Sequence, residues 1–150
     1  MKKLLLIALA VVFMSCGGPE EKSAGDVHTE HQHQTAAPTG LALNNGVKWK
    51  ADAATNTNVK AVVSVLDAFN ASSARSLDDY LGVATKLQVS LDKLIGDCKM
   101  QGPDHDALHL WLHPLLERLD ALMASTTADE ARLAYKAVDE QARLYNIYFE

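Results

Sequence analysis

The sequence has little cysteine, no block of basic residues and only one long apolar run. Two cysteines occur in 150 residues, and 14 Lys plus Arg against 19 Asp plus Glu give a formal net charge of −5. An acidic chain without a basic block has no surface that neutralises phosphates, which argues against nucleic acid as a partner. Eight glycines and four prolines are too few for a collagen-like or wholly disordered chain, and the length predicts a single domain.

Catalytic signatures are also missing. The chain has no nucleophile elbow, no phosphate-binding loop and no H-E-x-x-H pattern, and its Ser, His and Asp residues show no ordered arrangement. It lacks the C-x-x-C-H sequence that attaches haem, although a His and Met pair leaves haem ligation open. We therefore predict that the protein is not an enzyme. A metal-bound water is the one route to catalysis that the sequence leaves open.

The long apolar run lies at the N-terminus. Lys2 and Lys3 precede residues 4–14, which are all apolar. Eleven residues are too few to cross a bilayer, because a spanning helix needs about 20. A basic start, a short apolar stretch and small residues at its end are typical of a secretory signal, so we predict a signal peptide over residues 1–15.

Cys16 directly follows this run. The segment resembles the lipobox of bacterial lipoproteins, in which the cysteine is lipidated and becomes the new N-terminus; Ser15 fits the pattern, whereas Phe13 and Met14 differ from it. The resemblance implies lipidation at Cys16 and a lipid-anchored protein of the cell envelope. No Asp follows Cys16, which by resemblance to the sorting rule of Gram-negative lipoproteins indicates the outer membrane, on its periplasmic or its surface face. The alternative is a plain signal peptide that is cut elsewhere.

Residues 16–45 are rich in Gly, Glu, Ser, Thr, Gln and Pro and show no apolar periodicity. Such a segment cannot bury enough apolar surface to offset the entropy that is lost on ordering, so we predict a flexible tether. It contains His28, His31 and His33, for which loose metal binding and no role at all are both open.

Residues 46–150 show the periodicity of helices. Apolar residues recur at spacings of three and four, and no segment alternates as a strand does. Asp52 is placed to cap a first helix that runs to about residue 73. Ser76, with Asp79 three residues later, forms a capping box for a second helix, and Gly102 fits the end of that helix.

Two further helices are predicted after this point. Pro103 fits the first position of a helix over residues 103–124, and acidic residues follow it near the positive helix end. Pro114 lies inside this helix and removes a backbone donor, so we expect a kink. Thr127 and Glu130 form another capping box, which opens a fourth helix to about residue 149. Four amphipathic helices with short connections predict an all-α fold, an antiparallel four-helix bundle over residues 46–150.

Three of the six histidines fall on the third predicted helix, four residues apart. Positions with this spacing drift by about 40° per step, so His105, His109 and His113 line one flank of the helix. Neighbours at i and i+4 can hold one metal ion between them. The outer two lie about 12 Å apart along the axis, so one ion is not expected to bind all three.

Sulfur donors lie close to these histidines in the sequence. Cys98 and Met100 end the second predicted helix, and a short turn separates them from His105. Thiolate, thioether and imidazole together suit Cu(I) best, and Zn(II) follows through Cys and His alone. If Cys16 is lipidated, Cys98 has no partner for an internal disulfide. Burial of Cys98 as a small apolar side chain, and of Met100 as a packing residue, are the alternatives.

The segment from Cys98 to Pro114 carries a distinctive pattern. It matches C-x-M-x-G-x-x-H-x-x-L-H-x-W-L-H-P, and residues 46–49 match G-x-K-W. In these features the chain resembles a group of small bacterial envelope lipoproteins that is associated with resistance to copper and other heavy metals. The resemblance covers about residues 46–150. It implies only that the Cys, the Met and the three His of the motif occupy the group's distinctive positions.

Two functions follow as hypotheses. The first is an envelope lipoprotein that binds a soft transition metal, Cu(I) or else Zn(II), for buffering, delivery or sensing. Its partners would be the metal ion, the membrane through the lipid anchor, and an envelope protein such as a metal-efflux protein. The second is a helical module that docks on an envelope protein without metal.

Overall fold

The computed structural model describes residues 40–150 of the chain. The predicted signal peptide over residues 1–15, the predicted lipidation site Cys16 and the three histidines of the predicted tether lie outside the described residues. No helix within residues 40–150 combines the length and the apolar character needed to cross a bilayer.

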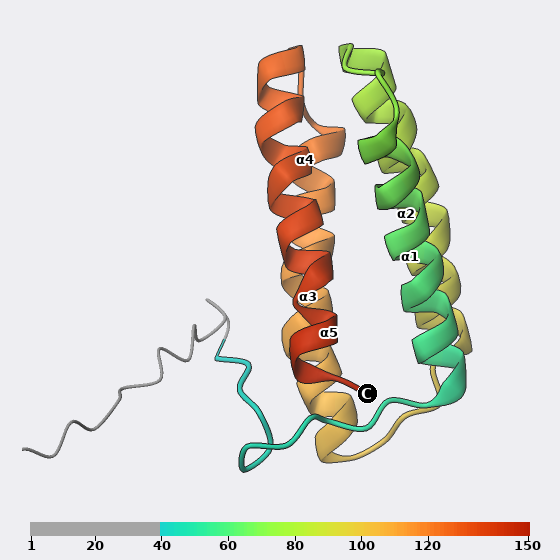
Figure 1. The fold of residues 1–150 in the computed structure, drawn as a ribbon, viewed down its shortest axis with the longest axis vertical. Coiled ribbons are helices and arrows are strands. Elements are labelled where there is room, and N and C mark those ends of the chain that lie inside the picture. Colours follow the sequence, from blue (N-terminus) through green and yellow to red (C-terminus); the bar gives the residue numbers. More distant parts are fainter. Residues whose placement is uncertain (1–39) are drawn as a thin grey trace, which may run out of the picture. The chain divides into compact units, whose positions relative to one another are not determined.

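The described part is all-α, as the sequence predicts (Figure 1). Its four long helices are α1 (Ala53–Ala71), α2 (Leu77–Asp97), α3 (Pro103–Met123) and α4 (Ala128–Arg143), and a short helix α5 (Tyr145–Tyr148) follows. Helices α1 and α2 pack as one hairpin and α3 and α4 as a second, and α2 joins the two hairpins by contacting both α3 and α4. The prediction of a four-helix bundle is therefore confirmed.

Side-chain caps fix where three of these helices begin. The Asp52 carboxylate accepts from the backbone N–H of Thr55 over 2.6 Å at the start of α1. Helices α2 and α4 each open with a complete capping box, in which a hydroxyl and an acidic side chain satisfy two backbone donors reciprocally. Helix α3 begins differently, because Gly102 takes a positive φ of 67° and Pro103 supplies the first helical residue.

Leucine dominates the core between the hairpins. Apolar side chains at spacings of three and four point inward from α2 and α3, where they are almost completely buried. The fully buried leucines of these two helices are Leu87, Leu91, Leu94, Leu108, Leu115, Leu119 and Leu122. Tyr80, Tyr135 and Phe69 pack ring against ring, with centroids 4.8–5.7 Å apart. This packing supplies the main stabilisation of the bundle without any bound group.

A reciprocal pair of hydrogen bonds joins α3 to α4. The indole Nε1 of Trp111 donates to the Gln141 carbonyl over 2.9 Å, and the Gln141 amide donates to the Trp111 carbonyl over 2.8 Å. Trp111 is fully buried. Pro114 follows three residues later inside a continuous α3 and removes one backbone donor from this turn. The donor that Pro114 lacks would have served the Leu110 carbonyl, so the Gln141 amide adds a bond from outside the helix at the next residue and does not replace the missing one.

The folded part begins before residue 46. Leu41 is only 1% exposed and belongs to the hydrophobic core, so the predicted tether boundary at residue 45 lies too late in the chain. A tight turn follows, in which Asn44 and Val47 exchange backbone hydrogen bonds and Asn45 and Gly46 both have positive φ. An Asn-Gly pair is the usual solution for such a turn. The burial of a single leucine leaves no periodic pattern in the sequence, so the composition of this segment did not reveal it.

The fourth helix ends earlier than predicted. It stops at Arg143 rather than near residue 149, and after α5 the chain becomes extended at Phe149. There Trp49 and Phe149 form a parallel β-bridge: the Trp49 N–H donates to the Tyr148 carbonyl over 2.8 Å, and the Glu150 N–H donates to the Trp49 carbonyl over 3.0 Å. The last predicted turn is helical as α5, after a break at Leu144, and backbone pairing with a segment 100 residues away in sequence follows this turn at Phe149.

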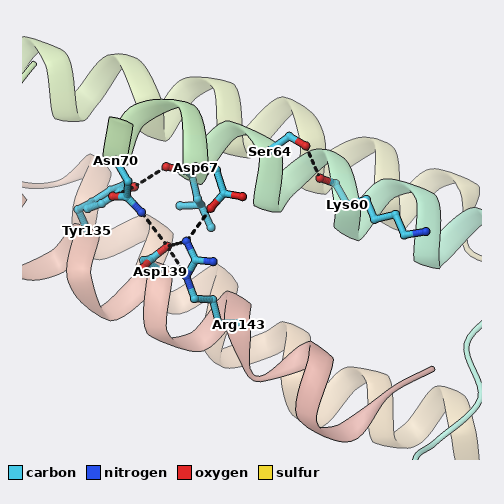
Figure 2. Close-up of polar contacts among 8 residues, drawn as sticks. Lys60, Ser64, Asp67, Asn70, Tyr135, Asp139 and Arg143 are labelled. Atoms are coloured by element: carbon cyan, nitrogen blue, oxygen red, sulfur yellow. Dashed lines mark hydrogen bonds and ion pairs between the residues drawn. The ribbon is translucent and has the colours of Figure 1, made fainter. Parts of the chain in front are cut away.

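Polar side chains connect α1 to α4 (Figure 2). Arg143 of α4 lies between Asp139 of its own helix and Asp67 of α1, with N–O distances of 2.9 and 2.8 Å. One turn further, the Tyr135 hydroxyl donates to the Asn70 side chain over 2.9 Å. We call these five residues the polar seam.

Candidate metal centre on helix α3

The first three turns of α3 carry the three histidines of the sequence motif. Two hydrogen bonds to the segment that leads into α1 hold this end of the helix and the loop before it in place. The Asp104 carboxylate accepts from the Lys50 N–H over 3.1 Å, and the second carboxylate oxygen of Asp52 accepts from the Lys99 N–H over 2.9 Å. The loop between α2 and α3 is therefore fixed against the segment that enters α1, and the histidine-bearing turns start from a rigid position.

The three imidazole rings contact one another in a continuous row. His105 Nε2 lies 3.1 Å from His109 Nε2, and His109 Nδ1 lies 2.9 Å from His113 Nε2. The ring planes of each neighbouring pair are inclined by 72° and 74°, with centroids 4.5 and 4.8 Å apart. We call these three residues the histidine row. The spacing of four residues predicted neighbouring rings on one flank, and the structure brings all three together.

Charge and burial act on the middle ring of the row. The pKa of His109 lies below its ordinary value, because partial burial disfavours the charged ring and because His105 and His113 would repel a positive charge. The Asp106 carboxylate acts in the opposite direction. A neutral His109 keeps a lone pair for a ligand or a hydrogen bond near pH 7, which a protonated ring would not.

The nitrogen separations are somewhat shorter than those that one metal ion requires of two ligands. Two imidazole nitrogens bound at about 2.0–2.1 Å with a tetrahedral angle are about 3.3–3.4 Å apart. The two close pairs of the histidine row, at 3.1 and 2.9 Å, differ from this by a few tenths of an ångström. Small rotations of the rings therefore suffice for either pair to bind one ion.

Cys98 and Met100 lie differently from what the predicted cluster requires. Both are partly buried side chains that pack against the hydrophobic core. Cys98 caps the end of α2, and its thiol is close enough to Tyr145 to contribute to the raised pKa of that phenol, after burial and the Asp52 carboxylate. The environment of the Cys98 thiol is thus the Tyr145 side of the bundle.

Within residues 40–150, no group of three or more His, Cys, Asp or Glu side chains is placed so that it could hold one metal ion. A single site built from Cys98, His105 and His109 together is therefore not present in this part of the chain. What the structure does bring together is two pairs of imidazole nitrogens that share His109.

Two interactions in this region were not predicted from the sequence. Asp104 and Asp106 lie in the first turn of α3, as predicted, and each also acts elsewhere: Asp104 accepts from the Lys50 N–H, and Asp106 favours a positive charge on His109. The Asp104 contact depends on the path of a distant segment and has no local signal. The electrostatic effect of Asp106 on His109 has one, because the two residues are three positions apart on a helix.

Comparisons with known proteins add nothing to this geometry. Searches of family models, of curated proteins and of solved structures give no significant match to the chain.

Proposed function

We propose that this protein binds a transition-metal ion, copper or zinc, through the histidine row. The observation that carries the proposal is the pair of close nitrogen contacts, 3.1 Å from His105 to His109 and 2.9 Å from His109 to His113. Imidazole nitrogens suit Cu(II) and Zn(II), whereas a preference for Cu(I) would need the sulfur donors as well. Since Cys98 and Met100 pack against the core, the site we propose uses nitrogen alone.

Such a site is suited to exchange rather than to permanent retention. A structural zinc site is closed by four protein ligands, whereas each pair in the histidine row supplies two nitrogens and leaves the remaining positions to water or a second molecule. The leucine core of the bundle requires no metal for its packing. Reversible loading for buffering, delivery or sensing therefore fits the row better than a role in folding.

The proposal also includes a cellular location for the protein. Lipidation of Cys16 would anchor it in the cell envelope, with the outer membrane as the expected site and a metal-efflux protein or another envelope protein as the candidate partner. Substitution Cys16→Ser tests the anchor. We expect the variant to incorporate no labelled fatty acid and to leave the membrane fraction. Equal labelling of the variant would show that Cys16 is not lipidated.

Metal binding is tested best in a background that removes competing ligands. The background carries five substitutions: Cys16→Ser, Cys98→Ser, His28→Gln, His31→Gln and His33→Gln. We expect this protein to bind Cu(II) with a dissociation constant of about 1 µM or tighter, which corresponds to about −8 kcal/mol. The measurement is titration in competition with a chelator of known affinity.

Two variants of this background separate the histidine row from the rest of the surface. His105→Ala with His109→Ala should weaken Cu(II) binding at least tenfold, whereas Glu117→Ala, an exposed position on the same helix, should leave it unchanged. Equal affinity in all three proteins would refute the proposed site. Tight copper binding that appears only when Cys98 is restored would show that the Cys98 thiolate is a metal ligand.

The metal-independent alternative has one observation in its favour. A hollow of about 560 Å³ lies between α1 and α2, lined in part by Val65, Ala68, Phe69 and Val83. An apolar side chain of an envelope protein would fit such a hollow. A partner that stays bound in excess chelator and is released by Ala68→Lys, but not by substitution of the histidines, would favour this function over metal binding.

A further inference from the structure

His109 differs from the other two histidines because both of its ring nitrogens face another imidazole. Its Nε2 contacts His105 and its Nδ1 contacts His113. For His105 and His113, only the Nε2 atom makes such a contact. The row is therefore two nitrogen pairs that share a central ring, rather than three equivalent ligands.

The proton count of a neutral row fits this arrangement. A neutral imidazole has one N–H donor and one lone pair, so the central ring can donate to one neighbour and accept from the other. Each contact then holds one proton between two nitrogens. A metal ion binds the same nitrogens in place of that proton, at a point beside the line that joins them.

We infer that His109 bridges two metal ions, one shared with His105 through Nε2 and one shared with His113 through Nδ1. The inference rests on the proposed function, since it concerns the same histidine row. It goes beyond it in assigning two ions to each chain and in making His109 the link between them. Each position takes two imidazole nitrogens from the chain and leaves the remaining coordination positions to water.

Protons balance in a defined order. When the first ion binds, the proton between its two nitrogens moves through solvent to the other nitrogen of the ring that carried it, so both rings stay neutral and His109 keeps an N–H on its other nitrogen. The second ion needs that other nitrogen, so the N–H bond breaks, the proton goes to solvent, and the ring becomes an imidazolate between two cations. No oxidant or reductant takes part. The second ion therefore releases one proton more from the bridging ring than the first.

The two positions are expected to differ in access. His113 is exposed, whereas His105 and His109 are partly covered. Asp106, whose carboxylate acts on His109, offsets part of the positive charge that accumulates when both positions are filled. The outer position beside His113 should accordingly exchange its ion faster with competing chelators.

The experiment counts Cu(II) ions in the background protein defined above. We expect two ions per chain, and one ion per chain in His105→Ala and in His113→Ala. In His109→Ala both pairs are lost, so binding should weaken at least tenfold at each position. Circular dichroism and denaturant unfolding of each variant confirm that the bundle is intact, and Glu117→Ala serves as the control with two ions.

Electron paramagnetic resonance identifies the bridge. Two Cu(II) ions joined by one imidazolate couple their spins, so the signal of the first equivalent should lose intensity as the second equivalent binds. Addition of the second equivalent should also release one further proton per chain in weakly buffered solution. Zn(II) should give the same stoichiometry without the signal.

The outcomes separate this inference from the proposed function. One ion per chain, with the same affinity in His113→Ala, overturns the bridge and leaves the single site of the proposed function standing. Two ions with uncoupled signals, or a second ion that persists in His109→Ala, also overturn it. Absence of any micromolar binding removes both the bridge and the proposed function.

Discussion

The buried amide of Gln141 permits a quantitative test of how α4 is fixed to α3. Its side chain is 1% exposed, its Nε2 donates to the Trp111 carbonyl over 2.8 Å, and its Oε1 accepts from Arg118. Substitution Gln141→Ala removes both hydrogen bonds, worth about 1 kcal/mol each. It also removes one buried methylene, worth about 0.8 kcal/mol. The better helix propensity of alanine returns about 0.4 kcal/mol.

We therefore expect Gln141→Ala to lower the free energy of unfolding by about 2–3 kcal/mol and the melting temperature by roughly 10 °C. Urea denaturation measures the loss as a shift of the midpoint at constant m. The matched control is Glu140→Ala, because this neighbouring side chain is exposed and makes only a surface ion pair with Lys136 at 3.5 Å. It should cost at most about 0.5 kcal/mol. A loss below about 1 kcal/mol for Gln141→Ala, or equal losses in both variants, would refute the reasoning.

Three further predictions concern other parts of the fold. Leu41→Ala should cost about 2–3 kcal/mol of unfolding free energy because the side chain is 1% exposed, whereas Leu133→Ala, at 60% exposure, should change it by less than about 0.5 kcal/mol in the same denaturation assay. Gly46→Ala should destabilise by about 1 kcal/mol because its φ is +86°, whereas Gly82→Ala should stabilise by about 0.5–1 kcal/mol, since a Cβ there meets no atom within 4 Å; the opposite order of melting temperatures would contradict this. Backbone N–H groups of the first turn of α1 lower the pKa of Asp52. The contribution of this carboxylate to the free energy of unfolding is therefore complete above the unfolded pKa of about 3.9 and is lost as the pH falls through the lower folded pKa. Asp52→Asn should flatten the decline in stability below about pH 4, and an unchanged decline would show that this carboxylate does not contribute.

Helix starts were predictable from the sequence because capping chemistry is local. Asp52, Ser76 and Thr127 each precede a helix by one residue, as predicted, and the hydrogen bonds that make them caps join residues only three positions apart. The end of α4 was not predictable in the same way. The break at Leu144 has no such local signal, and the extended backbone at Phe149 accompanies its pairing with Trp49, which only the assembled bundle brings together. The same holds for the burial of Leu41.

The same distinction between local contacts and tertiary packing applies to the candidate site. Neighbouring rings on one helix face follow from a spacing of four residues, so the contacts among His105, His109 and His113 were within reach of the sequence. The side chain of Cys98 was not, because its direction depends on how the end of α2 settles against the core and Tyr145. Proximity along the chain predicted that Cys98 and the histidines form one cluster, but the packing at the end of α2 places Cys98 against the core and near Tyr145.

The arrangement of the bundle as two hairpins has a consequence for the order of folding. Each hairpin joins helices that are adjacent in the chain, so it closes only a short loop and pays little entropy to do so. Topologies of this kind fold within microseconds to milliseconds. The polar seam, by contrast, joins residues of α1 and α4 that are 65 and 76 positions apart, and has no short loop to assist it. We therefore expect the transition state to contain both hairpins, with Arg143 and Tyr135 reaching their partners on the downhill side of the barrier.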